Sequence, residues 1–162
     1  QSIVQELIAI MNSTFRDKTG VSHALLLEHA CGTIAAMALR ISRNAQFLVK
    51  LGAADEIVRA MNKYPDKVAL QRQAALAIRN IVSRSIDLCP AVLQAGAQVA
   101  LTTIAARHQG CQDEVYAALR DLGVHVTMRV AEQDDVTGKM VLRQREMFGE
   151  RTPHFRAVFD KS

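Results

Sequence analysis

Residues 74–97, AALAIRNIVSRSIDLCPAVLQAGA, predict two short helices separated by a polar break. Pro90 suits the first turn of the second helix, because its fixed φ fits there and its missing N–H is not needed. Gly96 then ends that helix, since glycine best tolerates the left-handed conformation that commonly closes helices. Neither helix can bury a face alone, so other segments must cover both. The apolar residues of the first helix recur at helical spacing: Ala74, Ala75, Ile78, Ile81 and Val82.

The composition of the 162 residues indicates one all-α domain with an aliphatic core. Hydrophobic residues make up 49% of the chain, aromatic residues only 4%, and tryptophan is lacking. A chain of this length can bury close to 70% of the surface that it exposes when unfolded. The sequence contains no long alternating run of β-branched residues and no apolar run of the roughly 20 residues that cross a bilayer. We therefore expect a soluble helical chain with no membrane partner.

The net charge bears on nucleic-acid binding, and the cysteine content bears on the cellular compartment. The net charge of +4 is a mild basic bias of mixed sign, without the clustered Lys/Arg blocks typical of nucleic-acid binding. The three cysteines are an odd number without paired spacing, which indicates reduced thiols in a cytoplasmic or nuclear protein. They are Cys31, Cys89 and Cys111.

The chain resembles itself at a nearly fixed period. A shift of 44 places residues 46–53, QFLVKLGA, on residues 90–97, PAVLQAGA, so that Gly52 matches Gly96. A period of 20 to 50 residues indicates stacked structural repeats. Each unit is expected to contain a short helix, a glycine, a medium helix, a polar loop and a long helix.

Two further matches show that the unit varies in length. A shift of 50 places residues 7–12, LIAIMN, on residues 57–62, IVRAMN, so the first loop is six residues longer than its counterpart. A shift of 41 places residues 77–81, AIRNI, on residues 118–122, ALRDL. The third copy is therefore three residues shorter.

Local patterns before the repeats predict more helices. Residues 1–12 form an amphipathic helix, residues 13–22 a polar loop, and residues 22–39 and 43–51 two further helices. Gly32 weakens the helix that contains it, which implies that another segment passes close by. The chain begins inside a helical pattern without an initiator methionine, so we expect it to belong to a longer chain or a larger assembly.

The pattern AALAIRNIV, a spacer and AVLQAGA resembles the armadillo repeat family, and the resemblance covers roughly residues 1–125. It implies a right-handed α-solenoid of stacked three-helix repeats, two full and one partial. A less regular extension follows over residues 126–162, packed on the repeats or on a partner. The resemblance also implies a non-catalytic protein–protein interaction module or scaffold subunit. Its long third helices would line a concave face that binds a protein or peptide segment.

In peptide-binding armadillo proteins an asparagine of the third helix hydrogen-bonds the backbone of the ligand, and Asn80 occupies this position. Ala36 and Asp121 replace it in the neighbouring repeats, and Leu76 or Gly32 stands where a tryptophan often accompanies it. These departures argue against recognition of basic nuclear-localisation peptides. The alternative for Asn80 is a solvated or locally bonded polar side chain. The residues at helical spacing around Asn80, with their matches in the other repeats, form a stripe that is mostly polar and is expected to point away from the core. They are the predicted partner-binding residues: His29, Thr33, Arg40, Gln73, Asn80, Arg84, Glu114 and Asp121.

Catalytic and metal chemistry find little support. His108 and Cys111 are three residues apart and His125 lies downstream, but a tetrahedral zinc site needs a fourth ligand that the sequence does not offer. Residues 137–139, TGK, lack the remaining glycine and spacing of a phosphate-binding loop. The sequence places no Ser, Cys or carboxylate partner beside His23, His29 or His154, so catalysis by a nucleophile and a base finds no support. We therefore expect no enzyme activity, no metal and no cofactor.

The alternative function is nucleic-acid binding through basic residues of the repeats. Glu28, Glu114 and Asp121 are interleaved with these residues and argue against it. A steep linear fall of log affinity with log salt would distinguish phosphate binding from a peptide interface. The basic residues are Arg40, Arg72, Arg79, Arg84 and Arg107.

The extension after residue 125 has no clear period. Residues 124–130 alternate briefly, and residues 140–148 favour one more helix. The tail either packs on the repeats or a partner or is loose in solution. It contains three of the five phenylalanines in the chain: Phe148, Phe155 and Phe159.

Overall fold

The computed structural model describes residues 2–17, 22–134 and 137–147, which form a helical part followed by a β-hairpin. The all-α class predicted from the sequence is confirmed for the helical part. The α-helices are α1 (Ile3–Arg16), α2 (Ala24–Ala38), α3 (Ser42–Lys50), α4 (Ala53–Lys63), α5 (Val68–Val82), α6 (Cys89–Gln94), α7 (Ala97–Arg107) and α8 (Gln112–Asp121). The 3-10 turns η1 (Ile86–Leu88) and η2 (Gln109–Cys111) precede α6 and α8, and the hairpin consists of β1 (Val126–Gln133) and β2 (Met140–Met147).

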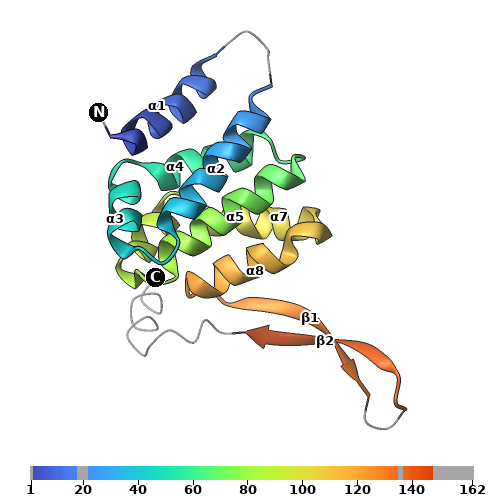
Figure 1. The fold of residues 1–162 in the computed structure, drawn as a ribbon. Helices are drawn as coiled ribbons and strands as arrows, with labels where there is room; N and C mark the ends of the chain where they lie inside the picture. The colour runs from blue at the N-terminus through green and yellow to red at the C-terminus, as the bar shows by residue number, and fades with distance from the viewer. Residues whose placement is uncertain (1, 18–21, 135–136, 148–162) are drawn as a thin grey trace.

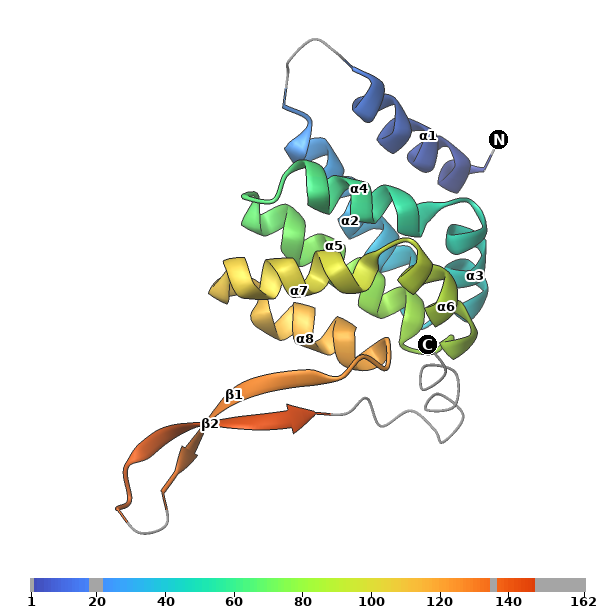
Figure 2. The ribbon, with the colours of Figure 1, turned by 180° about the vertical axis from the view of Figure 1, so that it is seen from behind.

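The helices pack in two layers, as Figure 1 shows. Helix α5 lies between α2 and α8 in the first layer, and α4 lies between α1 and α7 in the second. The short helices α3 and α6 lie at one end of both layers, which is clearest from behind in Figure 2. Neighbours within a layer are therefore segments that lie about one sequence repeat apart.

Aliphatic side chains fill the space between the layers. The buried apolar residues of the described part are Ala, Val, Leu, Ile, Met and Cys, as the composition predicted. Ile78 in α5 is fully buried, which confirms its predicted place between repeats. Among the described residues no single helix is both long and apolar enough to cross a bilayer; Ile86–Gln94 and Ala97–Arg107 meet that test only together, as a pair bent by 77°.

Two glycines turn the chain from the short to the medium helix of a unit. Gly52 and Gly96 precede α4 and α7 with φ angles of 86° and 90°, so both have the predicted left-handed conformation. Their N–H groups donate to the carbonyls of Val49 and Leu93, each at 2.9 Å. A side chain would strain these turns, because only glycine adopts this φ freely. Pro90 lies in the first turn of α6, also as predicted.

Helix α1 continues to Arg16, although the sequence predicted a loop from residue 13. Thr14 is buried, and Lys63 in α4 donates from Nζ to its carbonyl at 3.4 Å. Phe15 packs beneath Arg59, whose Cζ lies 4.2 Å from the ring centroid. Contacts with α4 therefore extend α1 beyond the point where the apolar period ends.

The helix predicted after residue 140 is instead a strand. β1 and β2 pair antiparallel, beginning with Val126 opposite Met147. In the turn, Asp134 accepts hydrogen bonds from the N–H of Thr137 at its carboxylate and of Gly138 at its carbonyl, both at 2.8 Å. Gly138 has a φ of 66°, so the turn chemistry favours a hairpin over a continued helix. The phenylalanines of the tail lie outside the described residues: Phe148, Phe155 and Phe159.

Candidate functional site

The predicted partner-binding stripe of α5 lies along the seam between α5 and α2. Asn80 donates from Nδ2 to the carbonyl of Ala35 in α2 at 2.9 Å. Gln73 Oε1 lies 3.2 Å from the position that a Cβ on Gly32 would occupy, so Gly32 does permit the close approach that its place in the sequence predicted. Gln73 and Asn80 are therefore half-buried residues that join α5 to α2.

The equivalent stripe of α8 also faces its neighbour. Glu114 Oε1 accepts hydrogen bonds from Arg72 Nε at 3.0 Å and from Arg72 Nη2 at 2.8 Å. Asp121 lies 3.6 Å from Arg79 Nε and accepts from Arg120 Nη2 at 3.1 Å. Asp121 is buried, so the prediction that it points away from the core is wrong. Its carboxylate is covered because it links α8 to α5.

Only on α2 does the predicted stripe face solvent along its length. His29 and Thr33 are exposed, and Thr33 Oγ1 donates to the His29 carbonyl at 2.9 Å. Arg40 and Arg84, which follow the ends of α2 and α5, are exposed as well. The structure thus does not gather the eight predicted residues on one open surface. Four are exposed (His29, Thr33, Arg40, Arg84), three are half-buried (Gln73, Asn80, Glu114) and Asp121 is buried.

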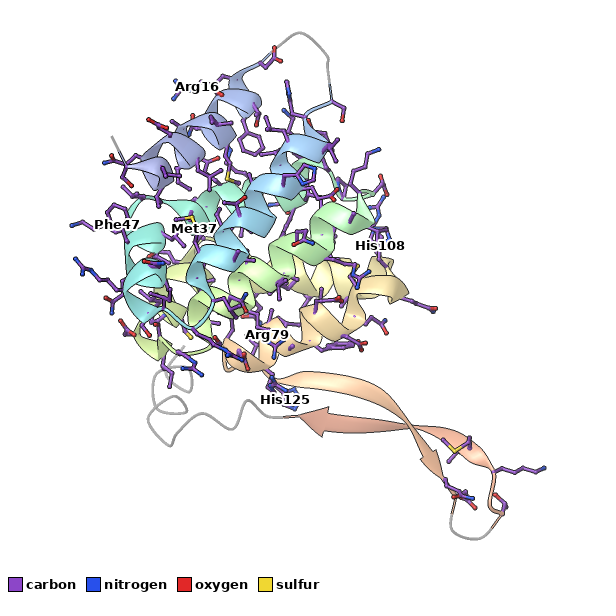
Figure 3. The ribbon with its side chains drawn as sticks, viewed as in Figure 1. Arg16, Met37, Phe47, Arg79, His108 and His125 are labelled. Atoms are coloured by element: carbon purple, nitrogen blue, oxygen red, sulfur yellow. The ribbon has the colours of Figure 1, made fainter. Side chains whose placement is uncertain are left out.

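A neighbouring row of residues occupies the open face of the α2, α5 and α8 layer. Its arginine side chains are 54% (Arg72), 42% (Arg79) and 44% (Arg120) exposed, whereas the carboxylates of Glu114 and Asp121 are only 24% and 8% exposed. Guanidinium groups therefore lie outermost. Figure 3 shows Arg79 at the end of this layer from which the hairpin departs. We call this row the arginine ridge: Arg72, Leu76 and Arg79 on α5, Ser83 directly after α5, and Ala117 and Arg120 on α8.

The arginine ridge was not predicted as a unit from the sequence. Arg72 and Arg79 were predicted only among the basic residues for nucleic acid, and Arg120 was not among them. A signal was present, because Arg72 and Arg79 are seven residues apart and so share one side of a helix. The shift of 41 that relates the repeats also places Arg79 on Arg120.

Arg72 and Glu114 each shift the pKa of the other in the direction that favours its charged form. Burial alone would raise the pKa of Glu114, but the hydrogen bond with Arg72, a backbone hydrogen bond and the charge of Arg72 together outweigh burial and lower that pKa. The same hydrogen bond to Glu114 raises the pKa of Arg72. Both side chains are therefore charged at neutral pH, and the contact between α5 and α8 is fully formed there.

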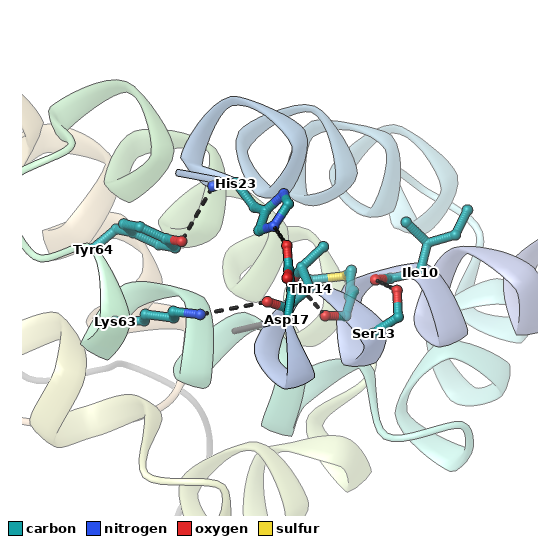
Figure 4. A network of polar contacts seen from close by, with 8 residues as sticks. Ile10, Ser13, Thr14, Asp17, His23, Lys63 and Tyr64 are labelled. Atoms are coloured by element: carbon teal, nitrogen blue, oxygen red, sulfur yellow. Dashed lines mark hydrogen bonds and ion pairs between the residues drawn. The ribbon is translucent and has the colours of Figure 1, made fainter. Parts of the chain in front are cut away.

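A second polar network joins the loops at the other end of the layers (Figure 4). His23 Nε2 lies 2.5 Å from Asp17 Oδ2, so the prediction that His23 has no carboxylate partner is wrong. The His23 N–H donates to the Tyr64 hydroxyl at 3.2 Å. In the following loop, His108 Nε2 lies 2.8 Å from the carbonyl of Pro65. These histidines connect successive loops, which is a structural role.

The three cysteine side chains are buried. Burial raises the pKa of Cys31 to about 12, and burial also raises the pKa of Cys111. These two thiols therefore stay protonated at neutral pH and are poor nucleophiles. Cys111 Sγ lies 3.8 Å from the carbonyl of His108, the residue with which it was considered as a zinc ligand. Within the described part of the chain, no three His, Cys, Asp or Glu side chains form a group suited to a metal ion.

In comparisons with known proteins, no family model, no curated protein and no solved structure matched this chain. Membership of the armadillo family therefore remains a prediction. The arginine ridge is the feature of the described structure on which a function can be argued.

Proposed function

We propose that the chain is a non-catalytic protein–protein interaction module, an armadillo-type right-handed α-solenoid that binds an extended acidic protein segment along the arginine ridge. The observation that carries this proposal is that the guanidinium groups of the ridge lie outermost while their carboxylate partners lie deeper. Charge-assisted hydrogen bonds from arginine to carboxylate are among the stronger polar contacts. The surfaces of stacked helical repeats are also well suited to extended ligands.

The spacing of the ridge suggests the form of the ligand. Arg72 and Arg79 are seven residues apart, which corresponds to about 10.5 Å along a helix that rises ~1.5 Å per residue. A segment in the polyproline II conformation has three residues per turn and covers about 9 Å in three residues, at ~3.1 Å per residue. Acidic side chains at positions i and i+3 of such a segment lie on one side and would therefore meet both arginines.

A hollow between the first turns of α2 and α5 supplies an apolar contact beside the ridge. Leu25 is 64% exposed and lines the hollow together with Val68 and Ala69. Glu28 and Lys67 lie at the same hollow and give it a polar border. An apolar side chain next to the acidic pair would fit here, and its burial would add affinity that charge alone does not provide.

Fluorescence anisotropy with labelled acidic peptides tests the proposal. The peptides carry two glutamates separated by two, three or four positions and one leucine outside the pair. We expect tightest binding at the i, i+3 spacing and at least tenfold weaker binding to the double variant Arg72→Gln, Arg79→Gln. Arg16→Gln is the control, because Arg16 is an exposed arginine at the end of α1, away from the ridge (Figure 3). Equal binding by the double variant and the wild type would refute the proposal.

Nucleic-acid binding is the alternative, because the same exposed arginines could contact phosphates. Phosphate neutralisation gives a linear dependence of log affinity on log salt, with a slope of about −0.9 per phosphate contacted on duplex DNA. A duplex oligonucleotide that binds more tightly than every peptide, with a slope reduced in the Arg72→Gln, Arg79→Gln variant, would assign the ridge to nucleic acid.

A further inference from the structure

The outer face of α1, on the side away from α4, repeats a face that is covered elsewhere in the chain. On α4 the equivalent positions are all buried, and one of them contacts α1: Glu56 Oε1 accepts a hydrogen bond from Asn12 Nδ2 at 2.9 Å. On α1 the same positions are exposed, with Ile3 at 76% and Ile10 at 46%. The shift of 50 sets Ile3, Glu6 and Ile10 of α1 on Ala53, Glu56 and Ala60 of α4.

Helix α2 shows the same contrast with α5. On α5 the equivalent positions form the seam with α2: Leu70 and Ala77 are fully buried, and Gln73 and Asn80 contact α2. On α2 all four positions are exposed, including Leu26 at 44%. The shift of 44 sets Leu26, His29, Thr33 and Ala36 of α2 on Leu70, Gln73, Ala77 and Asn80 of α5.

The adjacent helices α1 and α2 thus expose the positions that match those through which α4 and α5 pack against them. We propose that this outer face of α1 and α2 is a docking surface for a further antiparallel pair of helices, built like α1–α2. Such a pair would cover α1–α2 as α1–α2 covers α4–α5. It would offer a side-chain amide to Glu6, as Asn12 does to Glu56. It would also carry small residues opposite Ile3 and Ile10, because these isoleucines fill the space that alanines leave on α4.

A second copy of this chain fits the surface less well than such a helical pair. In a head-to-tail contact, α7 of the second copy would occupy the place that α1 takes beside α4. Successive shifts of 50 and 44 set Asn12 on Ala106 and Ile8 on Thr102. Ala106 has no amide to offer Glu6, and Thr102 replaces an apolar contact. The exposed side of α7 therefore lacks both the side-chain amide and the apolar contact that the docking surface requires.

An extended chain tests the proposal with a defined helical pair. Residues 1–52 are added as a second copy before Ile3, so that the added α1, α2 and α3 lead into the original α1 through Gly52, as they lead into α4 in the native chain. Hydrogen exchange is measured on the amides of the original α1. A second version carries Ile3→Ala and Ile10→Ala in the original α1, which reproduces the small residues of α4.

We expect the α1 amides to exchange at least tenfold more slowly in one or both extended chains than in the native chain. Changing Glu6 of the original α1 to lysine should remove most of this protection, whereas Val99→Lys on the exposed side of α7 should leave it unchanged. Unchanged exchange in both extended chains would overturn the proposal. It would also be overturned if the native chain sediments as a dimer that Ile10→Lys dissociates, because the surface would then serve self-association.

Discussion

Gln71 offers a sharp test of how the medium helix of a repeat ends. Its side chain is fully buried in α5, and Nε2 donates to the carbonyl of Met61 at 3.0 Å and to the carbonyl of Tyr64 at 2.9 Å. The last carbonyls of a helix have no partner within the helix. The amide of Gln71 therefore satisfies the buried carbonyl of Met61 and is a second donor to the carbonyl of Tyr64, which also accepts from the N–H of Lys67 at 3.1 Å.

Replacing Gln71 with methionine keeps the side-chain volume and removes both donors. A buried polar group left without a partner costs about 1–3 kcal/mol. One opposing contribution is visible, because Gln71 Oε1 is buried and accepts no hydrogen bond from the described residues, and methionine removes that oxygen. We therefore expect a net destabilisation of about 1–3 kcal/mol rather than twice that amount, or a fall in Tm of about 2–4 °C for each kcal/mol in a chain of this size.

Urea unfolding followed by circular dichroism at 222 nm measures this change. Gln98→Met is the control, because Gln98 is an exposed glutamine of α7 and its replacement should change the free energy of unfolding by less than about 0.5 kcal/mol. Hydrogen exchange should also quicken at the end of α4 in the Gln71 variant. If Gln71→Met were as stable as the wild type, the two hydrogen bonds would contribute no net stability and the argument would fail.

Three further predictions concern the core, the seam and the thiols. Ile78→Ala should lower the free energy of unfolding by about 2–5 kcal/mol through lost burial and a cavity, whereas Val99→Ala should change it by less than about 0.5 kcal/mol; urea unfolding compares them. The pKa of Glu114 is lower in the folded state, so its contribution to stability is present above its ordinary pKa of 4.5 and is lost as the pH falls through the folded value. Glu114→Gln should therefore weaken the dependence of the urea midpoint on pH below 4.5. Cys31 should resist iodoacetamide in the native protein and react once urea unfolds it, as mass spectrometry of its peptide would show. If Cys31 of the native protein reacted as fast as an exposed thiol, its burial would be contradicted.

The fold was predictable where local chemistry and helical period agree. The match of Gly52 with Gly96 located two turns that need a left-handed conformation, and the apolar spacing around Ile78 located the core of α5. The length of α1 was not predictable in the same way, since Phe15 is held in the helix by Arg59 of a distant segment. The second strand was missed because the pattern after residue 140 suits a helix as well, and the Asp134 turn decides between them.

The candidate site was only partly predictable, because the spacing of polar residues along a helix does not show whether solvent or another helix covers them. Gln73 and Asn80 share a polar side of α5, as the sequence indicated, but that side meets α2. Arg72 and Arg79 lie about a quarter turn away and face outward. Polar residues are normally predicted to face solvent. An interface between helices that is formed by amides and ion pairs therefore has the same sequence pattern as a binding face.

Comparing the same stripe in successive units resolves this ambiguity. A position that serves as a ligand contact should stay open where a neighbouring helix packs beside it, whereas a position in a seam should be open only where the neighbouring helices are absent. The stripe is half-buried or buried on α5 and α8 and open on α2, which is the pattern of a seam. The arginine ridge is open on both α5 and α8. We therefore propose the ridge for ligand binding and the open stripe of α2 for helix docking, so substitutions in the two surfaces should act independently.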